Sequence, residues 1–250
     1  QAGIAKVCIT PPVGCLMDGY GSRTHGAEAV HDDLFARALV LDDGVAKVAL
    51  VSVEMVGLRS ESIAAIRNRV QAATGIPGAN LYISAVHTHS GPACRYGDDE
   101  LSNRNLAATE DKIAGAVIMA GMQLTPAQLE FGRAPVQCGV NRRELRAGRI
   151  VLGVNPTGPV YPWVDFLHVT DAAGNTLAVW FCHPVHAVVM GPANYLISGD
   201  FPGAAARFIE RNCGGIALFA NGCCGNINSF PHNGTFADVE KLGRRLGAAV

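Results

Sequence analysis

Two histidines, His87 and His89, are separated by a single residue in the segment NLYISAVHTHSGP, whose pattern predicts a strand that ends in a loop. Residues i and i+2 of a strand project from the same face, so both imidazoles would reach one small volume. Two converging imidazoles suit zinc, which favours neutral histidine nitrogen. Histidines satisfied inside a core are the alternative, but the following Ser90-Gly91-Pro92 makes the motif more particular. The spacing therefore predicts part of a metal site.

A second pair of histidines, His183 and His186, follows the apolar segment TLAVWFC. Four of the eight histidines of the chain thus lie near only two predicted strand ends. A purely structural role for His183 would require a buried partner. The two residues are three apart, so their side chains need not face the same way. We favour His183 as the second metal ligand and keep His186 as the alternative.

A guanidinium and a glycine-rich loop supply further candidates. Arg142 follows a strand-like stretch and could hold a developing oxyanion or a substrate carboxylate, whereas solvated surface arginines are the alternative for Arg142 and Arg143. The loop NGCCGNINS (221–229) could bring backbone N–H groups close to a ligand or form a tight turn. Its Asn226 and Asn228 are candidate substrate-binding residues. The loop does not match GxxxxGK[ST] and has no lysine, which excludes a phosphate-binding loop.

The elements that must position these residues alternate between strands and helices, which predicts an α/β protein with mixed β-sheets flanked by helices. The apolar runs 34–43 and 47–58 around Asp43-Gly44 predict a hairpin, as do strands 164–170 and 176–182 around DAAGN. A strand is expected over 3–10. Helices are expected over 61–73, capped by Ser60, and over about 107–122.

Two strand–helix–strand units form a weak internal repeat. The first consists of KVALVSVEM, SESIAAIRNRV and LYISAVHTHSG, and the second of TLAVWFCHP, FPGAAARFIER and IALFANGCCGN. In α/β sheets, ligands bind at the carboxyl ends of the strands. The repeat therefore directs Glu54, the HTH triplet, CHPVH and NGCCGN towards shared sites.

The composition limits the class of protein. Hydrophobic residues make up 49% of the 250 residues and charged residues 16%, which indicates a compact globular protein. The length allows one large domain or two small ones, and we expect a single domain over 1–250. The formal net charge of −1 argues against nucleic acid as a partner. No apolar run approaches the roughly 20 residues that span a bilayer. None of the eight cysteines forms a CxxC pair, which favours reduced thiols and the cytoplasm, although their even number leaves a secreted or periplasmic protein open.

Several motifs occur in the order found in the neutral/alkaline ceramidases, and the chain resembles that family over essentially its whole length. The motifs are HTHSGP, Asn141-Arg142, WFCHP, SGDFPG and GCCGNIN, preceded by KVCITPPVG and HDDLFARALVLDDG. The resemblance implies a zinc-dependent amidase that cleaves an N-acyl bond, such as that of ceramide, in a small-molecule substrate. It also implies mixed sheets flanked by helices.

The resemblance also implies roles for single residues. His87 is similar to the first zinc-binding histidine of the family and His183 to the second, with Zn²⁺ as the cofactor. His89 resembles a neighbour that acts on the reacting amide, and Arg142 resembles the active-site arginine. The matching loop in the family, GDVSPN, carries a functional serine where this chain has Asn228.

The family's other zinc ligands, a Glu and a Tyr, would lie beyond residue 250, so we expect a truncated catalytic domain. A carboxylate must accept a proton from water, and Glu54 and Asp200 are candidates.

The alternatives to an amidase are an ester or lactone hydrolase, a phosphoesterase, and a metal-binding relative without catalysis. The HTH triplet lacks the downstream Asp-His of metallo-β-lactamases, which argues against that fold.

Overall fold

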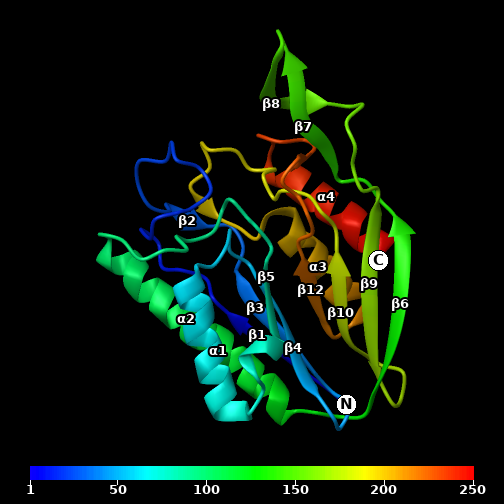
Figure 1. Cartoon of the computed structure of the whole chain (residues 1–250). Coiled ribbons are helices and arrows are strands. Elements are labelled where there is room, and N and C mark those ends of the chain that lie inside the picture. Colours follow the sequence, from blue (N-terminus) through cyan, green and yellow to red (C-terminus); the bar gives the residue numbers. More distant parts are fainter.

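Two four-stranded sheets pack face to face, and helices cover the outer side of each sheet (Figure 1). The computed structural model describes residues 1–250. The architecture confirms the expected mixed sheets flanked by helices. No helix is both long enough and apolar enough to cross a membrane.

The first sheet has the strand order β1-β3-β4-β5 and is covered by two helices. Its elements are β1 (Ala2–Cys8), β3 (Phe35–Asp42), β4 (Lys47–Val53), α1 (Ser60–Thr74), β5 (Leu81–Ala85) and α2 (Glu100–Met122). The predicted hairpin around Asp43-Gly44 is confirmed, since β3 and β4 pair antiparallel, whereas β4 and β5 are parallel. Alternate residues of β4 face opposite sides: Val51 packs under the helices, and Ser52 donates a hydrogen bond to the Phe219 carbonyl of the other sheet, at 2.6 Å.

The second sheet has the order β12-β10-β9-β6, and α3 and α4 cover its outer side. Its elements are β6 (Ala127–Pro135), β9 (Trp163–Asp171), β10 (Thr176–Cys182), α3 (Asp200–Cys213), β12 (Ile216–Ala220) and α4 (Phe236–Ala249). The predicted hairpin of β9 and β10 is confirmed, and β10 runs parallel to β12. Between the two sheets lies a smaller apolar cluster that includes Leu39, Val169 and Leu218. Each sheet thus buries one face under helices and the other face against its partner.

Short strands complete the molecule. A two-stranded sheet joins β2 (Ala29–Val30) to β11 (Leu196–Ile197), and a three-stranded sheet has the order β13 (Ile227–Ser229), β7 (Gly139–Arg146), β8 (Arg149–Asn155). The β7–β8 hairpin projects from one end of the molecule (Figure 1). A single 3₁₀ turn, η1 (Gly78–Asn80), precedes β5.

The internal repeat is visible as two parallel strand–helix–strand units. The first is β4-α1-β5 and the second is β10-α3-β12. A pair of parallel strands requires a crossover connection, and in both units a helix of 14 or 15 residues provides it. The carboxyl ends of β5, β10 and β12 lead directly into the histidine and cysteine motifs.

Two helix boundaries differ from the expectation. Ser60 is the first residue of α1 and not its cap, since Arg59 stands in the cap position without a side-chain hydrogen bond. Helix α2 begins at Glu100, seven residues before the expected start. Its first turn contains a single apolar residue, Leu101, and shows no apolar period. The Asp99 carboxylate caps this turn by accepting a hydrogen bond from the Ser102 N–H at 2.7 Å.

Candidate metal centre

The segments that follow β5, β10 and β12 are held together by backbone hydrogen bonds. Thr88 forms a parallel bridge with Ala187, and His186 forms one with Asn228. The His89 N–H donates to the Ala187 carbonyl at 3.2 Å, and the His186 N–H donates to the Ile227 carbonyl at 3.0 Å. Three segments far apart in the sequence therefore have a fixed relative position.

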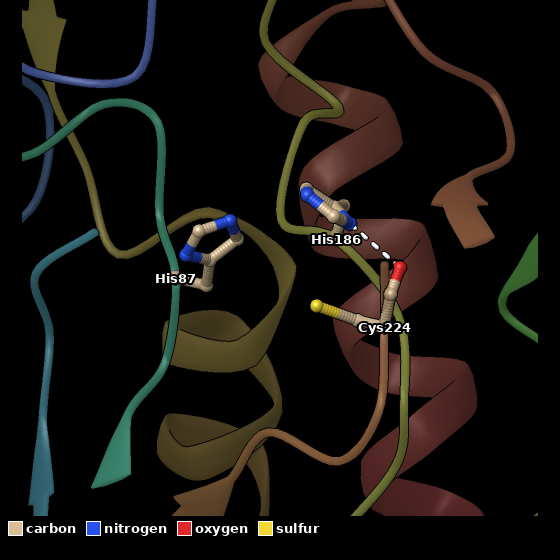
Figure 2. Close-up of side chains that lie close together, drawn as sticks. All are labelled: His87, His186 and Cys224. Carbon is tan, nitrogen blue, oxygen red and sulfur yellow. Dashed lines mark hydrogen bonds between the residues drawn. The ribbon is translucent and has the colours of Figure 1, made fainter. Parts of the chain in front are cut away.

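Three possible metal ligands meet where these segments join. The ligand atoms of His87, His186 and Cys224 all lie within 4.8 Å of one another. Figure 2 shows the two rings on neighbouring loops and the sulfur of Cys224 pointing towards His87. Ligands bound to one tetrahedral zinc ion at 2.0–2.3 Å are about 3.3–3.6 Å apart. The observed group is therefore compatible with one ion after small side-chain rotations.

Hydrogen bonds at the far nitrogen orient both imidazoles. Nδ1 of His87 lies 2.6 Å from the Val56 carbonyl oxygen, and Nδ1 of His186 lies 2.8 Å from that of Cys224. A carbonyl oxygen only accepts, so Nδ1 carries the proton in both rings and donates it. Nε2 then keeps its lone pair, which is the form in which histidine binds a metal ion. The donor set thus fits a zinc ion in tautomer as well as in position.

His87 reaches the group by a backbone conformation that the sequence did not predict. Strand β5 ends at Ala85, so the HTH triplet lies in a loop and not on the strand. His87 has φ 68°, in the left-handed region that non-glycine residues rarely adopt. Its N–H donates to the Met55 carbonyl at 2.9 Å, which holds the turn against the end of β4. Such a conformation persists only where the surroundings enforce it.

His183, the favoured second ligand, lies outside this group, whereas His186, the alternative, belongs to it. His183 directly follows β10, and its Nδ1 lies 2.8 Å from the Trp163 carbonyl oxygen at the start of β9. The sheet therefore fixes the ring of His183, and burial lowers its pKa. After His183 the chain turns away from the sheet at Pro184, and His186 then lies beside His87.

His89 lies beside the group without belonging to it. Its ring centroid is 4.9 Å from that of His87 and 5.7 Å from that of His186, and Tyr20 packs edge-on against it at 5.0 Å. Burial, together with the neighbouring His87 and His186, lowers the pKa of His89 to about 3. Both ring nitrogens are buried, and neither meets the geometric criteria of a hydrogen bond to the protein. His89 is therefore a buried, neutral imidazole.

Arg142 and Asn228 lie next to each other, and the backbone of Asn228 pairs with that of His186. The Arg142 guanidinium donates from Nη1 to Oδ1 of Asn228 at 3.1 Å and from Nε to the Gly225 carbonyl at 3.1 Å. Burial lowers the pKa of Arg142. The pKa of His186 is lowered to about 4, chiefly by burial and in part by the charge of Arg142. The side chain of Asn228 is therefore held by the arginine, and Nη2 of Arg142 remains available.

Two cavities lie near these residues. One, of 520 Å³, reaches Gly19 and Tyr20 beside His89 and Val56 beside His87, and its wall carries six charged residues: Asp18, Arg23, Arg59, Arg95, Asp98 and Asp99. The other, of 380 Å³, is mostly apolar and includes Asn226, Cys182 and Cys223. Asn226 thus lines the apolar cavity, and its carbonyl accepts a hydrogen bond from the Arg142 N–H at 2.8 Å.

The two carboxylates considered as proton acceptors have structural partners. Glu54 is buried and accepts from Nη1 of Arg37 at 2.6 Å and from the Phe35 N–H at 2.7 Å. Asp200 is fully buried, has φ 52° and accepts from the N–H groups of Phe201 and Met190. Burial raises the pKa of Asp200 to about 7. Neither belongs to the metal-binding group.

Sequence reasoning did not name Cys224 or Tyr20 as site residues. A signal for Cys224 existed, because the internal repeat places NGCCGN at the carboxyl end of β12, as it places the HTH triplet after β5. No signal pointed to Tyr20, whose hydroxyl donates to the Met190 carbonyl at 2.9 Å and whose ring supports His89. The contact between Tyr20 and His89 joins segments about 70 residues apart in the sequence.

Comparison with known proteins gives one consistent result. The sequence profile described as neutral/alkaline non-lysosomal ceramidase, N-terminal, matches residues 1–223. The neutral ceramidase of Pseudomonas aeruginosa is 26% identical over 271 aligned residues, which cover 97% of this chain and 40% of that protein. The neutral ceramidase of Mycobacterium tuberculosis is 28% identical over 222 residues, covering 82% of this chain and 35% of that protein.

The fold is also found among solved structures. The crystal structure of the neutral ceramidase from Pseudomonas aeruginosa superposes with a TM-score of 0.82 at 24% identity, covering 99% of this chain and 43% of that one. The chain therefore has the same fold over nearly its whole length. It spans about 40% of the length of the first relative that it matches.

Proposed function

Because the chain belongs to the neutral/alkaline non-lysosomal ceramidase family, we propose that it forms the metal-binding part of a zinc-dependent hydrolase that cleaves an N-acyl amide bond. Ceramide, the substrate that the relatives are named for, is the first candidate. The observation that carries the proposal is the convergence of His87 and His186, both with Nδ1 engaged and Nε2 free.

In this proposal, His87 and His186 hold the ion. When bound, zinc acts as a Lewis acid that polarises a carbonyl group and lowers the pKa of a coordinated water to about 7. The backbone carbonyls of Val56 and Cys224 keep both rings in the binding tautomer. Such outer partners typically contribute about 10–100-fold to metal affinity or activity.

His89 and Arg142 act on the substrate. The ring of His89 is neutral at physiological pH, so its N–H can donate to the oxygen of the amide carbonyl as negative charge develops there. Nη2 of Arg142 can donate to the same oxygen or to a polar group of the substrate. Asn228 holds the guanidinium in place through its Oδ1, and Asn226 lines the apolar cavity, which we propose as the binding site of the acyl chain. Removing a donor of this kind lowers kcat by roughly 10²–10³-fold.

A metal-binding relative without hydrolysis is the second candidate, and Asn228 is the residue that favours it. The carboxamide of Asn228 is engaged by Arg142 and is no nucleophile. An ester or lactone hydrolase would use the same residues, because its tetrahedral intermediate places charge on the same oxygen.

The test is a hydrolysis screen of the zinc-loaded protein against N-acyl amides and esters of varied chain length, ceramides included. We expect amide cleavage that is lost on chelation and restored by zinc. His87→Ala is the matched control and should be inactive towards every substrate. Bound zinc with no hydrolysis of any amide or ester would refute the proposed activity and leave the binding domain.

A further inference from the structure

The polar cavity of 520 Å³ beside His89 has no role in the proposed function. We propose that Arg23, in the wall of this cavity, binds a carboxylate on the amine half of the substrate, so that the substrates are N-acyl amino acids. The proposal rests on the proposed function for the place of the amide bond. The site for the carboxylate itself is argued from the cavity and its charges.

The two cavities border different parts of the candidate site. The polar cavity includes Tyr20, whose ring packs against His89. The apolar cavity includes Ile227, whose carbonyl accepts the hydrogen bond from the His186 N–H. A substrate whose amide lies at these histidines therefore has apolar space on one side and polar space on the other. The acyl half suits the apolar cavity, which leaves the polar cavity for the amine half.

The aspartates in the wall of the polar cavity are engaged or solvated. Oδ1 of Asp18 lies 3.4 Å from Nη2 of Arg95, so these two charges compensate each other. The Asp99 carboxylate caps α2, where the partial positive charge of the helix N-terminus stabilises it. Asp98 is exposed, and water and salt screen its charge. None of the three forms an ion pair with Arg23.

Arg23 is a half-buried cation without a counter-charge. Its guanidinium donates from Nη1 to the Asp18 carbonyl and from Nη2 to the Asn194 carbonyl, both at 3.0 Å, and it forms no ion pair. Its Cζ lies 4.9 Å from the ring centroid of Tyr20 and 5.9 Å from that of Tyr195. Burial lowers the pKa of Arg23, yet a guanidinium keeps its proton in a protein. A carboxylate of the ligand would therefore compensate a charge that the protein leaves uncompensated.

The arrangement of the guanidinium suits a carboxylate. Each terminal nitrogen carries two N–H groups and uses one of them on a backbone carbonyl, which leaves one on each nitrogen for a ligand. Two such groups match the two oxygens of a carboxylate. Arg23 and His89 also contact the same ring, that of Tyr20, and one carbon separates the carboxylate from the amide nitrogen in an N-acyl amino acid. A neutral amine half, as in ceramide, would leave Arg23 without a counter-charge.

The experiment compares N-lauroylglycine with N-lauroylglycinamide, which share the acyl chain and the amide bond and differ in one charged group. Binding is measured by isothermal titration calorimetry on protein freed of metal by chelation, so that the carboxylate gains no affinity from zinc. We expect the wild type to bind N-lauroylglycine roughly 10–100-fold more tightly, as a hydrogen bond to a charged group contributes. Equal affinities, tighter binding of the glycinamide, or no binding of either ligand would overturn the proposal.

Two variants assign the effect to one arginine. Arg23→Gln should lose the preference for N-lauroylglycine. Arg59→Gln is the matched control, because Arg59 lies in the same wall but is exposed, where a charge contributes little. A preference that survives in Arg23→Gln, or that both variants lose equally, contradicts the assignment. The comparison of ligands on the wild type needs no variant, so a folding defect in Arg23→Gln leaves that test in place.

Hydrolysis of the same two compounds by the zinc-loaded protein separates this proposal from the proposed function. A binding preference in a protein that cleaves neither compound supports the carboxylate site and refutes amide hydrolysis. Cleavage of both compounds with equal kcat/KM and equal affinity supports amide hydrolysis and refutes the carboxylate site.

Discussion

Glu54→Gln is expected to destabilise the protein strongly, because it leaves a buried guanidinium with one carboxylate in place of two. Arg37 and Glu54 are each 1% exposed in their side chains, and the second carboxylate, Glu210, accepts from Nε of Arg37 at 3.0 Å. Glutamine has the same shape, but one of its two ends is an NH₂ group. That end must face either the arginine or the Phe35 N–H, so one donor loses its acceptor.

The size of the effect follows from this arrangement. Breaking a buried ion pair by neutralising one partner costs about 3–5 kcal/mol. Glu210 still partners Arg37, so we expect the lower end of that range, about 3 kcal/mol. For a chain of this size the urea m-value is about 3 kcal/mol per molar, and the midpoint should fall by roughly 1 M.

The assay is urea unfolding followed by far-ultraviolet circular dichroism, with Glu100→Gln as the matched control. Glu100 is exposed and pairs with Arg104 at 3.4 Å within one helix, so the same chemical change there should cost less than about 0.5 kcal/mol. Equal and small losses in both variants would refute the account of the buried pair. Hydrolysis per folded molecule, measured below the transition, should be unchanged in Glu54→Gln, since Glu54 serves the fold; a large drop in kcat would return it to the role of proton acceptor.

Three further predictions concern the site and its surroundings. His186→Ala should lower zinc affinity roughly 10²-fold while His183→Ala leaves it within a few-fold, as measured by titration with a chromogenic chelator; the reverse result would restore His183 as the ligand. His87→Ala should abolish metal and activity together, whereas His89→Ala should keep its zinc and lose roughly 10²–10³-fold in kcat, and equal zinc loss from both would make His89 a ligand. The pKa of Asp200 is raised in the folded protein from its usual 3.8 to about 7, so its stabilising contribution is complete below about pH 4 and is lost as the pH rises through 7. The Asp200→Asn variant cannot ionise at this position, so it does not lose this stability. Between about pH 4 and about pH 8, the free energy of unfolding of the variant minus that of the wild type, measured in urea, should therefore increase by up to roughly 4 kcal/mol. Parallel pH profiles of the two proteins would contradict this.

The elements that the sequence predicted well are those with a strong local signal. The hairpin around Asp43-Gly44 and the parallel strand–helix–strand units followed from apolar periodicity and turn residues within short windows. The first turn of α2 carried no such period, and its start depends on the cap by Asp99. The stacking of the two sheets has no local signal, because each inner face meets residues more than 100 positions away.

The site was predictable to the level of motifs but not of atoms. Two histidines two apart were expected to converge because they shared a strand face, yet His87 and His89 lie in a loop and converge because φ of His87 is positive. Spacing could not choose between His183 and His186, since the choice depends on where the chain leaves the sheet. The proximity of Cys224 depends on the parallel pairing of β10 with β12, which no short window of sequence contains.

The position of the metal-binding group in the chain has a thermodynamic consequence. His87 lies on one sheet's loops, and His186 and Cys224 lie on the other's, with about 100 residues of chain between the first two. An ion bound to both His87 and His186 would cross-link the two halves of the fold. It would close a loop of about 100 residues and so remove conformational entropy from the chain. Because the unfolded chain has no assembled site, zinc at 100 times its dissociation constant would add about 2.7 kcal/mol to the free energy of unfolding. The two sheets would then separate only after the ion dissociates, so that chelation becomes a way to uncouple them.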